Sequence, residues 1–349
     1  MVARMGRRTF TAALATGWAA GLIPGGAAAA PAPALLKPPR LKQGDVIGLV
    51  APGGYTTEAA IAKAVHNIES LGCRVKQGAN LRAVFGNYAG TAQQRLDDLH
   101  AMFADPEVNA IWAIRGGSGC ISLLAGLDYA LIRAHPKILL GYSDITALHL
   151  AIHRHAGLIT FHGPVASSTL SDYATEQLLA VLANPQPQTV IPMSSANAYE
   201  ALTAPQYAVR TVHAGVASGR LIGGNLSMVS ALAGTPYAAD FTNALLFLED
   251  VNEAPYRIDR WMTQLDLAGG LRNAAAVIMG ICENCGAEQG DQSLTLDQTL
   301  NLHLDPLAIP AVTGYSFGHI RNQCTLPVGL VATLDTGHQT ITLHEAAVR

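Results

Sequence analysis

Ser143, in the tetrapeptide Gly141-Tyr142-Ser143-Asp144, is the residue whose type and setting point most directly to chemistry. An apolar run at 137–140 precedes it, and a helical pattern at 145–152 follows it. A serine held out on a tight strand-to-helix bend can act as an acyl-transfer nucleophile, with the free N–H groups of the helix start near its target. Ser and Asp at this position also form ordinary helix N-caps, which greatly outnumber catalytic bends. The tetrapeptide therefore leaves both interpretations open.

A serine nucleophile needs a general base, and the base usually needs an acid that orients it. The base candidate is His319, which ends a Gly-bracketed segment at 314–319 that we expect to be a loop after a strand. The acid candidate is Glu249, at the end of a five-residue apolar strand, where a carboxylate is costly unless it is paired or functional. A salt bridge from Glu249 to Arg257 or Arg260 is the structural alternative.

Three histidines close behind Ser143 in the sequence form a weaker pattern. His149 and His153 have the i, i+4 spacing of metal ligands, but the acid of an H-E-x-x-H motif is absent between them. We expect these two, and His155, to be packed or surface histidines, and we predict no metal site.

Strands that alternate with helices over residues 45–167 predict an α/β domain with a parallel sheet. We expect strands at 45–51, 73–76, 108–114, 137–140 and 158–161, and helices at 57–71, 92–103, 121–127 and 145–152. Sites in such sheets lie at the carboxyl ends of the strands. The segments that occupy strand ends are 52–54, 115–119, 141–144 and 162–163.

The composition changes after about residue 167. Residues 168–211 are rich in Ala, Pro, Asn, Ser and Thr and are typical of a linker region, with one helix at 174–183. Residues 212–349 predict a second domain that is richer in strands than in helices. Its expected elements are a helix at 256–267 and strands at 244–250, 274–280, 308–314, 328–334 and 339–343.

The N-terminus has the pattern of an export signal. Arginines at positions 4, 7 and 8 precede an apolar stretch at 10–23 and small residues at 27–30, and no Asp or Glu occurs before residue 45. The Arg7-Arg8 pair resembles a twin-arginine signal, so we expect residues 1–29 to be cleaved and the mature protein to be periplasmic. An ordinary secretory signal and a retained anchor are the alternatives. The stretch is too short and Gly-rich for a comfortable membrane-spanning helix, so we expect no stable membrane insertion after cleavage.

Composition and charge restrict the possible partners. Half of the 349 residues are hydrophobic and 13% are charged, which suits one large or two medium globular domains. Without residues 1–29 the basic residues fall from 22 to 19 against 25 acidic ones, and the net charge changes from −3 to −6. No Lys/Arg run remains, so we expect binding neither to nucleic acid nor to an anionic membrane surface.

Five cysteines are too few, and odd in number, for a disulfide scaffold. Cys282 and Cys285 form a C-x-x-C pair that could be bridged in an oxidising compartment or form half of a zinc site, although nothing nearby completes such a site. We expect Cys73 and Cys120 to be small buried residues.

An ordered set of short motifs resembles the LD-carboxypeptidase family of serine peptidases, which includes murein tetrapeptide carboxypeptidases and microcin C self-immunity proteins. The resemblance covers roughly residues 45–343. The motifs are Gly86-Asn-Tyr-Ala-Gly-Thr91, Arg95-Leu-Asp-Asp-Leu99, Phe103-Ala-Asp-Pro106, Ala113-Ile-Arg-Gly-Gly117, Pro136-Lys137, Gly141-Tyr-Ser-Asp-Ile-Thr146, His162-Gly-Pro164, Gly223-Gly-Asn-Leu226, Gly234-Thr-Pro236, Leu248-Glu-Asp250, Tyr256-Arg-Ile-Asp-Arg260 and Phe317-Gly-His319.

The resemblance implies a role for each candidate residue. The nucleophile would be Ser143, the base His319 and the acid Glu249, with no metal or other cofactor. The oxyanion would be held by the backbone N–H groups of Asp144 and Gly117.

The R-G-G loop at 115–117 supplies the remaining implied roles. Gly116 is the second choice for the oxyanion hole, and Arg115, Gly116 and Ser118 would contact substrate. The family usually has an aromatic residue where this chain has Ser118, so substrate preference is expected to differ.

The resemblance also implies an architecture and an activity. The fold would be α/β, with an N-terminal Rossmann-like parallel-sheet domain, a β-rich C-terminal domain, a site in the cleft between them and often a homodimer. The activity would be release of a terminal D-alanine from an L-centre in murein tetrapeptide. The alternatives are the same triad acting on a microcin-like acyl-adenylate or another exported peptide, and a non-catalytic periplasmic binding protein, which has no need for Ser143, Glu249 and His319 together at strand ends.

Overall fold

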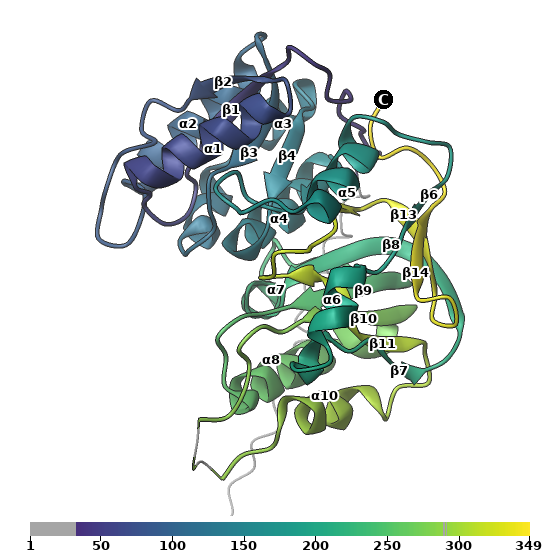
Figure 1. The fold of residues 1–349 in the computed structure, drawn as a ribbon. Coiled ribbons are helices and arrows are strands. Elements are labelled where there is room, and N and C mark those ends of the chain that lie inside the picture. Colours follow the sequence, from purple (N-terminus) through teal and green to yellow (C-terminus); the bar gives the residue numbers. More distant parts are fainter. Residues whose placement is uncertain (1–32, 289, 291) are drawn as a thin grey trace, which may run out of the picture. The chain divides into compact units, whose positions relative to one another are not determined.

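The structure is a computed structural model that describes residues 33–288, 290 and 292–349. The predicted export signal at residues 1–29 lies outside the described residues. Within them, no helix is both long and apolar enough to cross a membrane. The described chain forms two β-sheets with helices packed against them (Figure 1).

The first sheet has six strands in the order β12-β5-β4-β3-β1-β2. Neighbours among β1 to β5 pair in parallel, and β12 is antiparallel to β5, so the predicted parallel sheet is confirmed. Every residue of β1 and β4 is buried, as expected for strands that are covered on both faces. The strands are β1 (Val46–Val50), β2 (Arg74–Gln77), β3 (Val108–Ala113), β4 (Ile138–Gly141), β5 (Thr160–His162) and β12 (Leu326–Val328).

Helices connect the strands of the first sheet, and local sequence sets where they begin. The α2 helix starts with a capping box in which the Thr91 hydroxyl accepts from the N–H of Gln94 and the Gln94 side chain accepts from the N–H of Thr91. The helical elements are α1 (Glu58–Ser70), α2 (Ala92–Ala104), η1 (Cys120–Gly126), α3 (Tyr129–Ala134), η2 (Ser143–Ile145), α4 (Thr146–Ala156) and α5 (Asp172–Leu182), of which η1 and η2 are 3₁₀ turns.

The second sheet has eight strands in the order β6-β14-β13-β8-β9-β10-β11-β7. Its centre, β8 to β11, is parallel, and the flanking pairs are antiparallel. The strands are β6 (Thr189–Ile191), β7 (Arg210–His213), β8 (Val216–Asn225), β9 (Ala244–Glu249), β10 (Ala276–Ile281), β11 (Ala311–Gly318), β13 (Val331–Asp335) and β14 (Thr340–Leu343). The helical elements are α6 (Ser195–Glu200), η3 (Pro205–Tyr207), α7 (Leu226–Leu232), α8 (Pro255–Leu267), α9 (Gly270–Asn273) and α10 (Leu296–Leu304).

Several segments differ from the sequence-based expectations. The expected strand at 328–334 is divided between the end of β12 in the first sheet and β13 in the second. The expected helix at 121–127 is the 3₁₀ turn η1, which begins after the left-handed Gly119. The expected loop at 314–319 is wrong, because β11 continues to Gly318 past an irregularity in its pairing with β10. Residues 168–211, expected to be a linker, contain α5, β6 and α6, and β6 pairs with β14 in the second sheet.

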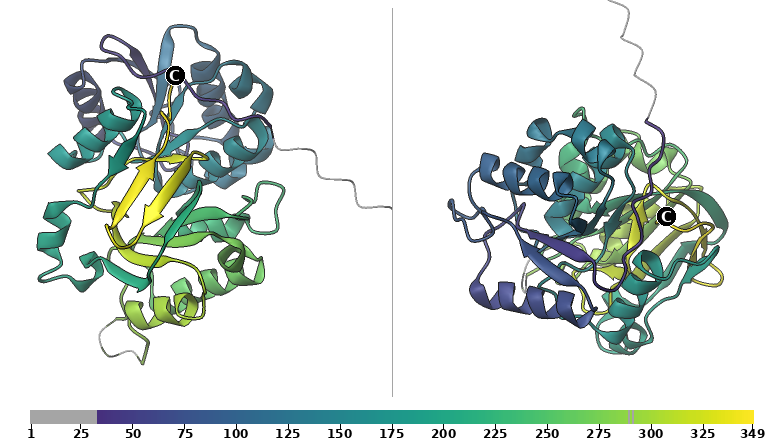
Figure 2. Two further views of the ribbon diagram at one scale, coloured as in Figure 1. Left: turned by 90° about the vertical axis from the view of Figure 1, so that its right-hand side faces the viewer. Right: turned by 90° about the horizontal axis from the view of Figure 1, so that it is seen from above.

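The C-terminal part of the chain returns to the first sheet. β12 pairs with β5, although it follows β11 of the second sheet in sequence. The last residue lies beside the start of the described chain (Figure 2), where the N–H of Arg40 donates to the carbonyl of Arg349 and the N–H of Arg349 donates to that of Pro38. The first sheet therefore depends on residues from both ends of the sequence.

Candidate functional site

Ser143 lies on the bend between β4 and α4. Its φ of +65° is left-handed, a conformation that costs a serine about 1–3 kcal/mol and is found mainly at functional positions. Its side chain does not cap the helix: neither η2 nor α4 has a side-chain hydrogen bond at its N-cap. The Asp144 carboxylate instead accepts from the N–H of Cys120 at 2.9 Å. The helix-cap interpretation of this motif is therefore wrong, and the Ser143 hydroxyl is available for other contacts.

Ser143, His319 and Glu249 form one chain of hydrogen bonds. His319 Nε2 lies 2.9 Å from Ser143 Oγ, and His319 Nδ1 lies 2.7 Å from Glu249 Oε2. The Glu249 side chain is fully buried, whereas 16% of the His319 side chain is exposed. Residues far apart in sequence thus meet in the order hydroxyl, imidazole, carboxylate.

Strands β9 and β11, which lie on either side of β10 in the second sheet, position the acid and the base. Glu249 is the last residue of β9, and His319 directly follows β11. Gly318, with φ +124°, brings them together, because a Cβ there would lie 2.6 Å from the carbonyl oxygen of Ile281 and 3.3 Å from the Glu249 carboxylate. Only glycine allows this close approach of the β11 end to β9 and β10.

His319 and Glu249 each stabilise the ionised form of the other. Burial alone lowers the pKa of His319, but the charge of Glu249 and its hydrogen bond raise that pKa above its ordinary value. Burial alone raises the pKa of Glu249, but the charge and hydrogen bond of His319 outweigh it and lower the pKa. Glu249 is therefore ionised near neutral pH and accepts the Nδ1–H of His319 at Oε2. In the neutral form of His319 with the proton on Nδ1, Nε2 accepts from the Ser143 hydroxyl.

The loop at 115–117 packs against the Ser143 bend through Gly116. A Cβ on Gly116 would lie 2.8 Å from the Ser143 Cβ and 3.1 Å from the nitrogen of Asp144, so the Gly116 backbone packs directly on the serine bend. The carbonyl of Gly116 accepts from the N–H of Gly54 at 2.9 Å, which holds the loop in place. Among the described residues, the N–H groups of Gly117 and Asp144 donate to no other group of the chain. They are free to bind an anion.

Comparison with known proteins identifies the family. Models of the N-terminal and C-terminal domains of LD-carboxypeptidases match residues 47–163 and 218–334. The chain is 36% identical over 320 residues to a probable murein peptide carboxypeptidase of Bacillus subtilis, with 89% of this chain and 95% of the relative covered. The chain belongs to the LD-carboxypeptidase family. This membership makes it a serine-type carboxypeptidase.

Two further comparisons agree with this family. A murein tetrapeptide carboxypeptidase of Pseudomonas aeruginosa is 32% identical over 295 residues, with 83% of this chain and 92% of the relative covered. The solved structure of the microcin C7 self-immunity protein MccF without ligand superposes with a TM-score of 0.80 at 25% identity, covering 90% of this chain and all of the other. The fold described above is thus an LD-carboxypeptidase fold.

The other residues expected to contact substrate lie on the same loop of this LD-carboxypeptidase. Arg115 is exposed, and its guanidinium donates to the carbonyl of Tyr55 at 3.1 Å. The Ser118 hydroxyl accepts from the side-chain amide of Asn87 at 2.8 Å. Ser118 therefore ties the loop to the segment around Asn87.

The structural alternative for Glu249 is wrong. Arg257 pairs with Glu253 at 3.0 Å, and the Arg260 guanidinium lies 5.5 Å from the centre of the Tyr256 ring. Neither arginine pairs with Glu249, because its carboxylate is on the buried end of β9, where His319 meets it.

Two neighbours of the triad, Tyr142 and Asn225, were not predicted from the sequence. The Tyr142 ring lies 4.7 Å from the His319 ring, edge to face, and burial together with the Glu249 charge raises the pKa of Tyr142 to about 12. The side-chain amide of Asn225 donates to Asp250 at 2.9 Å, next to Glu249. Both residues stand inside motifs quoted above, but the spacing of those motifs does not reveal side-chain contacts.

The remaining candidates lie away from the triad or make structural contacts. His149 Nε2 contacts the carbonyl oxygen of Gly141 at 2.9 Å, and His153 is half-buried. Cys282, Cys285 and the other three cysteines are buried. Within residues 33–288, 290 and 292–349, no group of three or more His, Cys, Asp or Glu could hold a metal.

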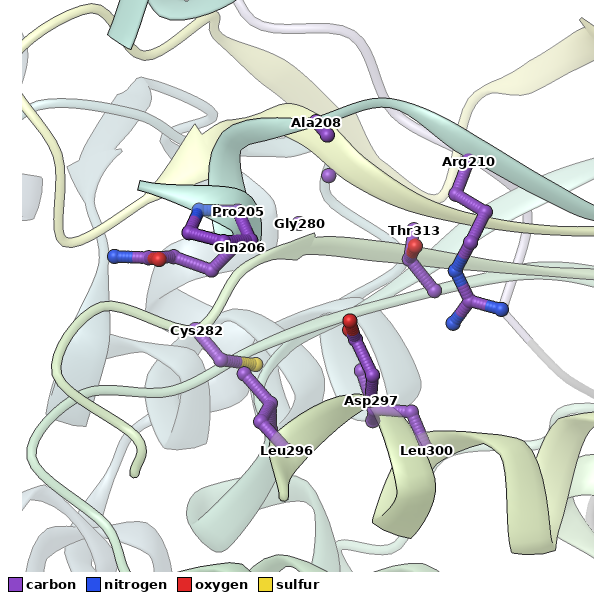
Figure 3. A pocket seen from close by; sticks show the side chains of 11 residues that line it. Pro205, Gln206, Ala208, Arg210, Gly280, Cys282, Leu296, Asp297, Leu300 and Thr313 are labelled. Atoms are coloured by element: carbon purple, nitrogen blue, oxygen red, sulfur yellow. The ribbon is translucent and has the colours of Figure 1, made fainter. Parts of the chain in front are cut away.

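A cavity of about 150 Å³ lies between η3, α10 and the strands β7, β10 and β11 (Figure 3). None of Ser143, Glu249 and His319 lines it. Its charged side chains are the half-buried Arg210, whose Nη2 has no hydrogen-bond partner among the described residues, and the exposed Asp297. We therefore place the candidate site at Ser143.

Proposed function

We propose that this LD-carboxypeptidase releases the terminal D-alanine of murein tetrapeptide, with Ser143 as nucleophile, His319 as general base and Glu249 as the acid that orients the base. The observation that carries the proposal is the unbroken chain from Ser143 Oγ through both His319 nitrogens to Glu249. Hydroxyl, imidazole and carboxylate in this order are the arrangement that activates a serine, whatever their order in sequence.

In the first half of the reaction, His319 Nε2 takes the Ser143 proton as Oγ attacks the amide carbonyl between the L-centre and the terminal D-residue. The imidazolium that forms is stabilised by the Glu249 carboxylate at Nδ1. His319 then gives the proton to the leaving amine, and the C–N bond breaks. Free D-alanine departs, and the rest of the peptide stays bound to Ser143 as an ester.

In the second half, His319 takes a proton from water, and the hydroxide attacks the ester carbonyl. The C–O bond to Ser143 breaks, and the proton returns to Oγ. The tripeptide carboxylic acid leaves, and the enzyme is regenerated without any cofactor.

The oxyanion of both tetrahedral intermediates would accept from the N–H groups of Asp144 and Gly117. Both groups are without an acceptor among the described residues, and Asp144 is at the helix start. Gly116, whose backbone packs on Ser143, is the second choice. Loss of one such donor commonly costs 10²–10³ in kcat.

The murein substrate is supported by the relatives from Bacillus subtilis and Pseudomonas aeruginosa, whose names include murein peptides. Arg115, Gly116 and Ser118 would contact the peptide. With the signal pattern at residues 1–29, the enzyme would be exported, by the twin-arginine route, and would trim peptidoglycan peptides in the periplasm, as a homodimer.

Mass spectrometry of purified murein tetrapeptide tests the proposal. The mature protein is expected to remove one D-alanine, and Ser143→Ala is expected to remove none. Ser218→Ala is the matched control, because that serine is exposed on β8 and bonds only to Thr333 among the described residues. Release by the Ser143→Ala protein at the wild-type rate would remove Ser143 from the nucleophile role.

A second candidate function is supported by the likeness to MccF and by Ser118. The same triad would cleave a microcin-like acyl-adenylate or another exported peptide in a cleft that lacks the usual aromatic side chain. If the folded wild-type protein leaves murein tetrapeptide intact but hydrolyses an aminoacyl-adenylate such as aspartyl-adenylate, this second function replaces the first.

A further inference from the structure

His162, at the end of β5, is a buried histidine that the proposed mechanism does not use. It is 0% exposed, and neither ring nitrogen has a hydrogen-bond partner among the described residues. Its ring packs edge to face against Phe247 at 5.4 Å, Tyr142 at 6.0 Å and Phe317 at 6.2 Å between centroids. A polar ring in a wall of aromatic side chains is costly, so its place there needs a reason.

The contacts put this ring beside the strand that carries the acid. Phe247 and Glu249 are two residues apart on β9, so their side chains are on the same face of the strand. His162 also pairs with Gly141 across β4 and β5, two residues before Ser143. The imidazole thus lies where the nucleophile strand meets the acid strand.

Glu249 has an unfilled hydrogen-bonding position on this side. Oε2 accepts from His319, but Oε1 has no partner among the described residues. The charged or titratable groups that face the carboxylate are His319 after β11, His162 on β5, Tyr142 after β4 and Asp250 beside it on the chain. The amide of Asn225 donates to Asp250 and also lowers the pKa of Glu249 through a contact with its carboxylate, but it makes no hydrogen bond to Oε1.

The protonation state of His162 makes it a donor. Burial lowers its pKa to about 4, so the ring is neutral near pH 7 and carries one N–H. A neutral imidazole has one proton to give and no acceptor for it among the described residues, while Glu249 Oε1 is an acceptor with no donor.

We propose that His162 is a positioning residue that directs its N–H at Oε1 of Glu249 and so fixes the plane in which Oε2 accepts from His319. The proposal rests on the function proposed above. A ring rotation or one bridging water completes the bond, and in both cases the N–H is the group that matters. A carboxylate held at both oxygens cannot turn away from His319, whereas one held at Oε2 alone can.

Two substitutions separate the N–H from the packing. His162→Phe keeps an aromatic ring between Phe247 and Phe317 but removes the donor, and His162→Gln restores an N–H donor. His153→Phe is the matched control, since His153 is a half-buried histidine on α4 whose Nδ1 has no hydrogen-bond partner among the described residues and whose pKa burial also lowers to about 4.

The first measurement needs no substrate. The pKa of His319 is determined by NMR titration of the imidazole in the wild type and each variant. His162→Phe is expected to lower that pKa, because a Glu249 carboxylate that can turn stabilises the imidazolium less, and His162→Gln is expected to bring it back. An unchanged His319 pKa in a folded His162→Phe protein would overturn the proposal.

Steady-state kinetics on murein tetrapeptide provide the second measurement. His162→Phe is expected to lower kcat about 10- to 100-fold with KM within about twofold, as for other groups that orient a catalytic side chain. His162→Gln should recover most of that loss, and His153→Phe should lose less than about threefold. If the Gln and Phe variants are equally impaired, the residue acts through packing and the proposal is wrong.

The two proposals fail in different ways. If the wild type has no activity on murein tetrapeptide, the proposed substrate is wrong, but the shift in the His319 pKa still decides the role of His162. If the wild type is active and the His319 pKa is the same in the wild type and the His162 variants, only the proposed positioning role of His162 is wrong.

Discussion

Replacing Glu249 with Gln tests the electrostatic core of the site. Gln keeps the size of the side chain and removes its charge. The Glu249 side chain is fully buried, and among the described residues its ion-pair partner is His319. Two unit charges about 4 Å apart interact by about 4 kcal/mol at an effective dielectric constant of 20. Each 1.4 kcal/mol corresponds to a tenfold change in rate, so kcat is expected to fall about 10³-fold.

The sign of the pH effect follows from the same pair. Glu249 raises the pKa of His319, so the acidic limb of the kcat/KM profile of the wild type lies above the range of an ordinary histidine. Without the charge that limb should move to lower pH. The assay is D-alanine release followed from pH 4 to 9.

Glu253→Gln is the matched control, since Glu253 follows Glu249 closely in sequence and pairs with the exposed Arg257. It should change kcat/KM less than about threefold, because exposed ion pairs contribute little. A folded Glu249→Gln enzyme that keeps kcat/KM within tenfold of the wild type, or an acidic limb that stays in place, would refute the reasoning.

Three further outcomes follow from the structure. Gly318→Ala should abolish activity and lower the melting temperature, because its Cβ would lie 2.6 Å from the Ile281 carbonyl at a φ of +124°; a fully active variant would contradict this geometry. Gly116→Ala should cut kcat at least tenfold with the melting temperature within a few degrees, since its Cβ would lie 2.8 Å from that of Ser143, and wild-type kinetics would show that the loop is not needed there. Acid should destabilise the fold, because burial lowers the pKa of His149 to about 3 and those of His153 and His162 to about 4. Between pH 6 and pH 4 the unfolded chain therefore binds protons that the native histidines do not, although burial raises the pKa of Asp250 to about 6 and offsets part of this effect. The free energy of unfolding in urea is therefore expected to fall towards acid over this range, since each proton bound only by the unfolded chain contributes about 1.4 kcal/mol per pH unit, and a flat profile would contradict it.

The sequence predicted the first sheet well because its strands are short apolar runs that alternate with amphipathic helices. It predicted β11 poorly. A glycine inside an apolar segment usually signals a turn, whereas Gly314 is accommodated at a pairing irregularity and the strand continues. The short edge strands β6 and β7 were missed because they have few buried residues, so their pairing and not their hydrophobic pattern defines them.

Some features of the site could likewise be predicted from the sequence, and others could not. Residue types and motifs led to Ser143, Glu249 and His319, whereas the choice between Arg257 and His319 as the partner of Glu249 depended on a contact 70 residues away in sequence. The left-handed backbone at Ser143 was also beyond the sequence, because a serine has no intrinsic preference for it and the surrounding structure must impose it. Long-range contacts and local strain are properties of the folded chain.

The position of His319 explains how a site divided between two sheets keeps its geometry. Ser143 follows a strand of the first sheet, and Glu249 ends a strand of the second. His319 lies on the segment 319–325, which leaves the second sheet at the end of β11 and enters the first at β12. The N–H of Cys324 donates to the carbonyl of Ser316 at 2.7 Å, which ties the far end of the segment back to β11. Because one short segment is anchored in both sheets, a movement of either sheet would carry the imidazole with it, and the hydroxyl and the carboxylate stay within reach of the same ring. That preorganisation is what an acyl-transfer site needs, since a loss of alignment of about 1 Å can cost a factor of about 10² in rate.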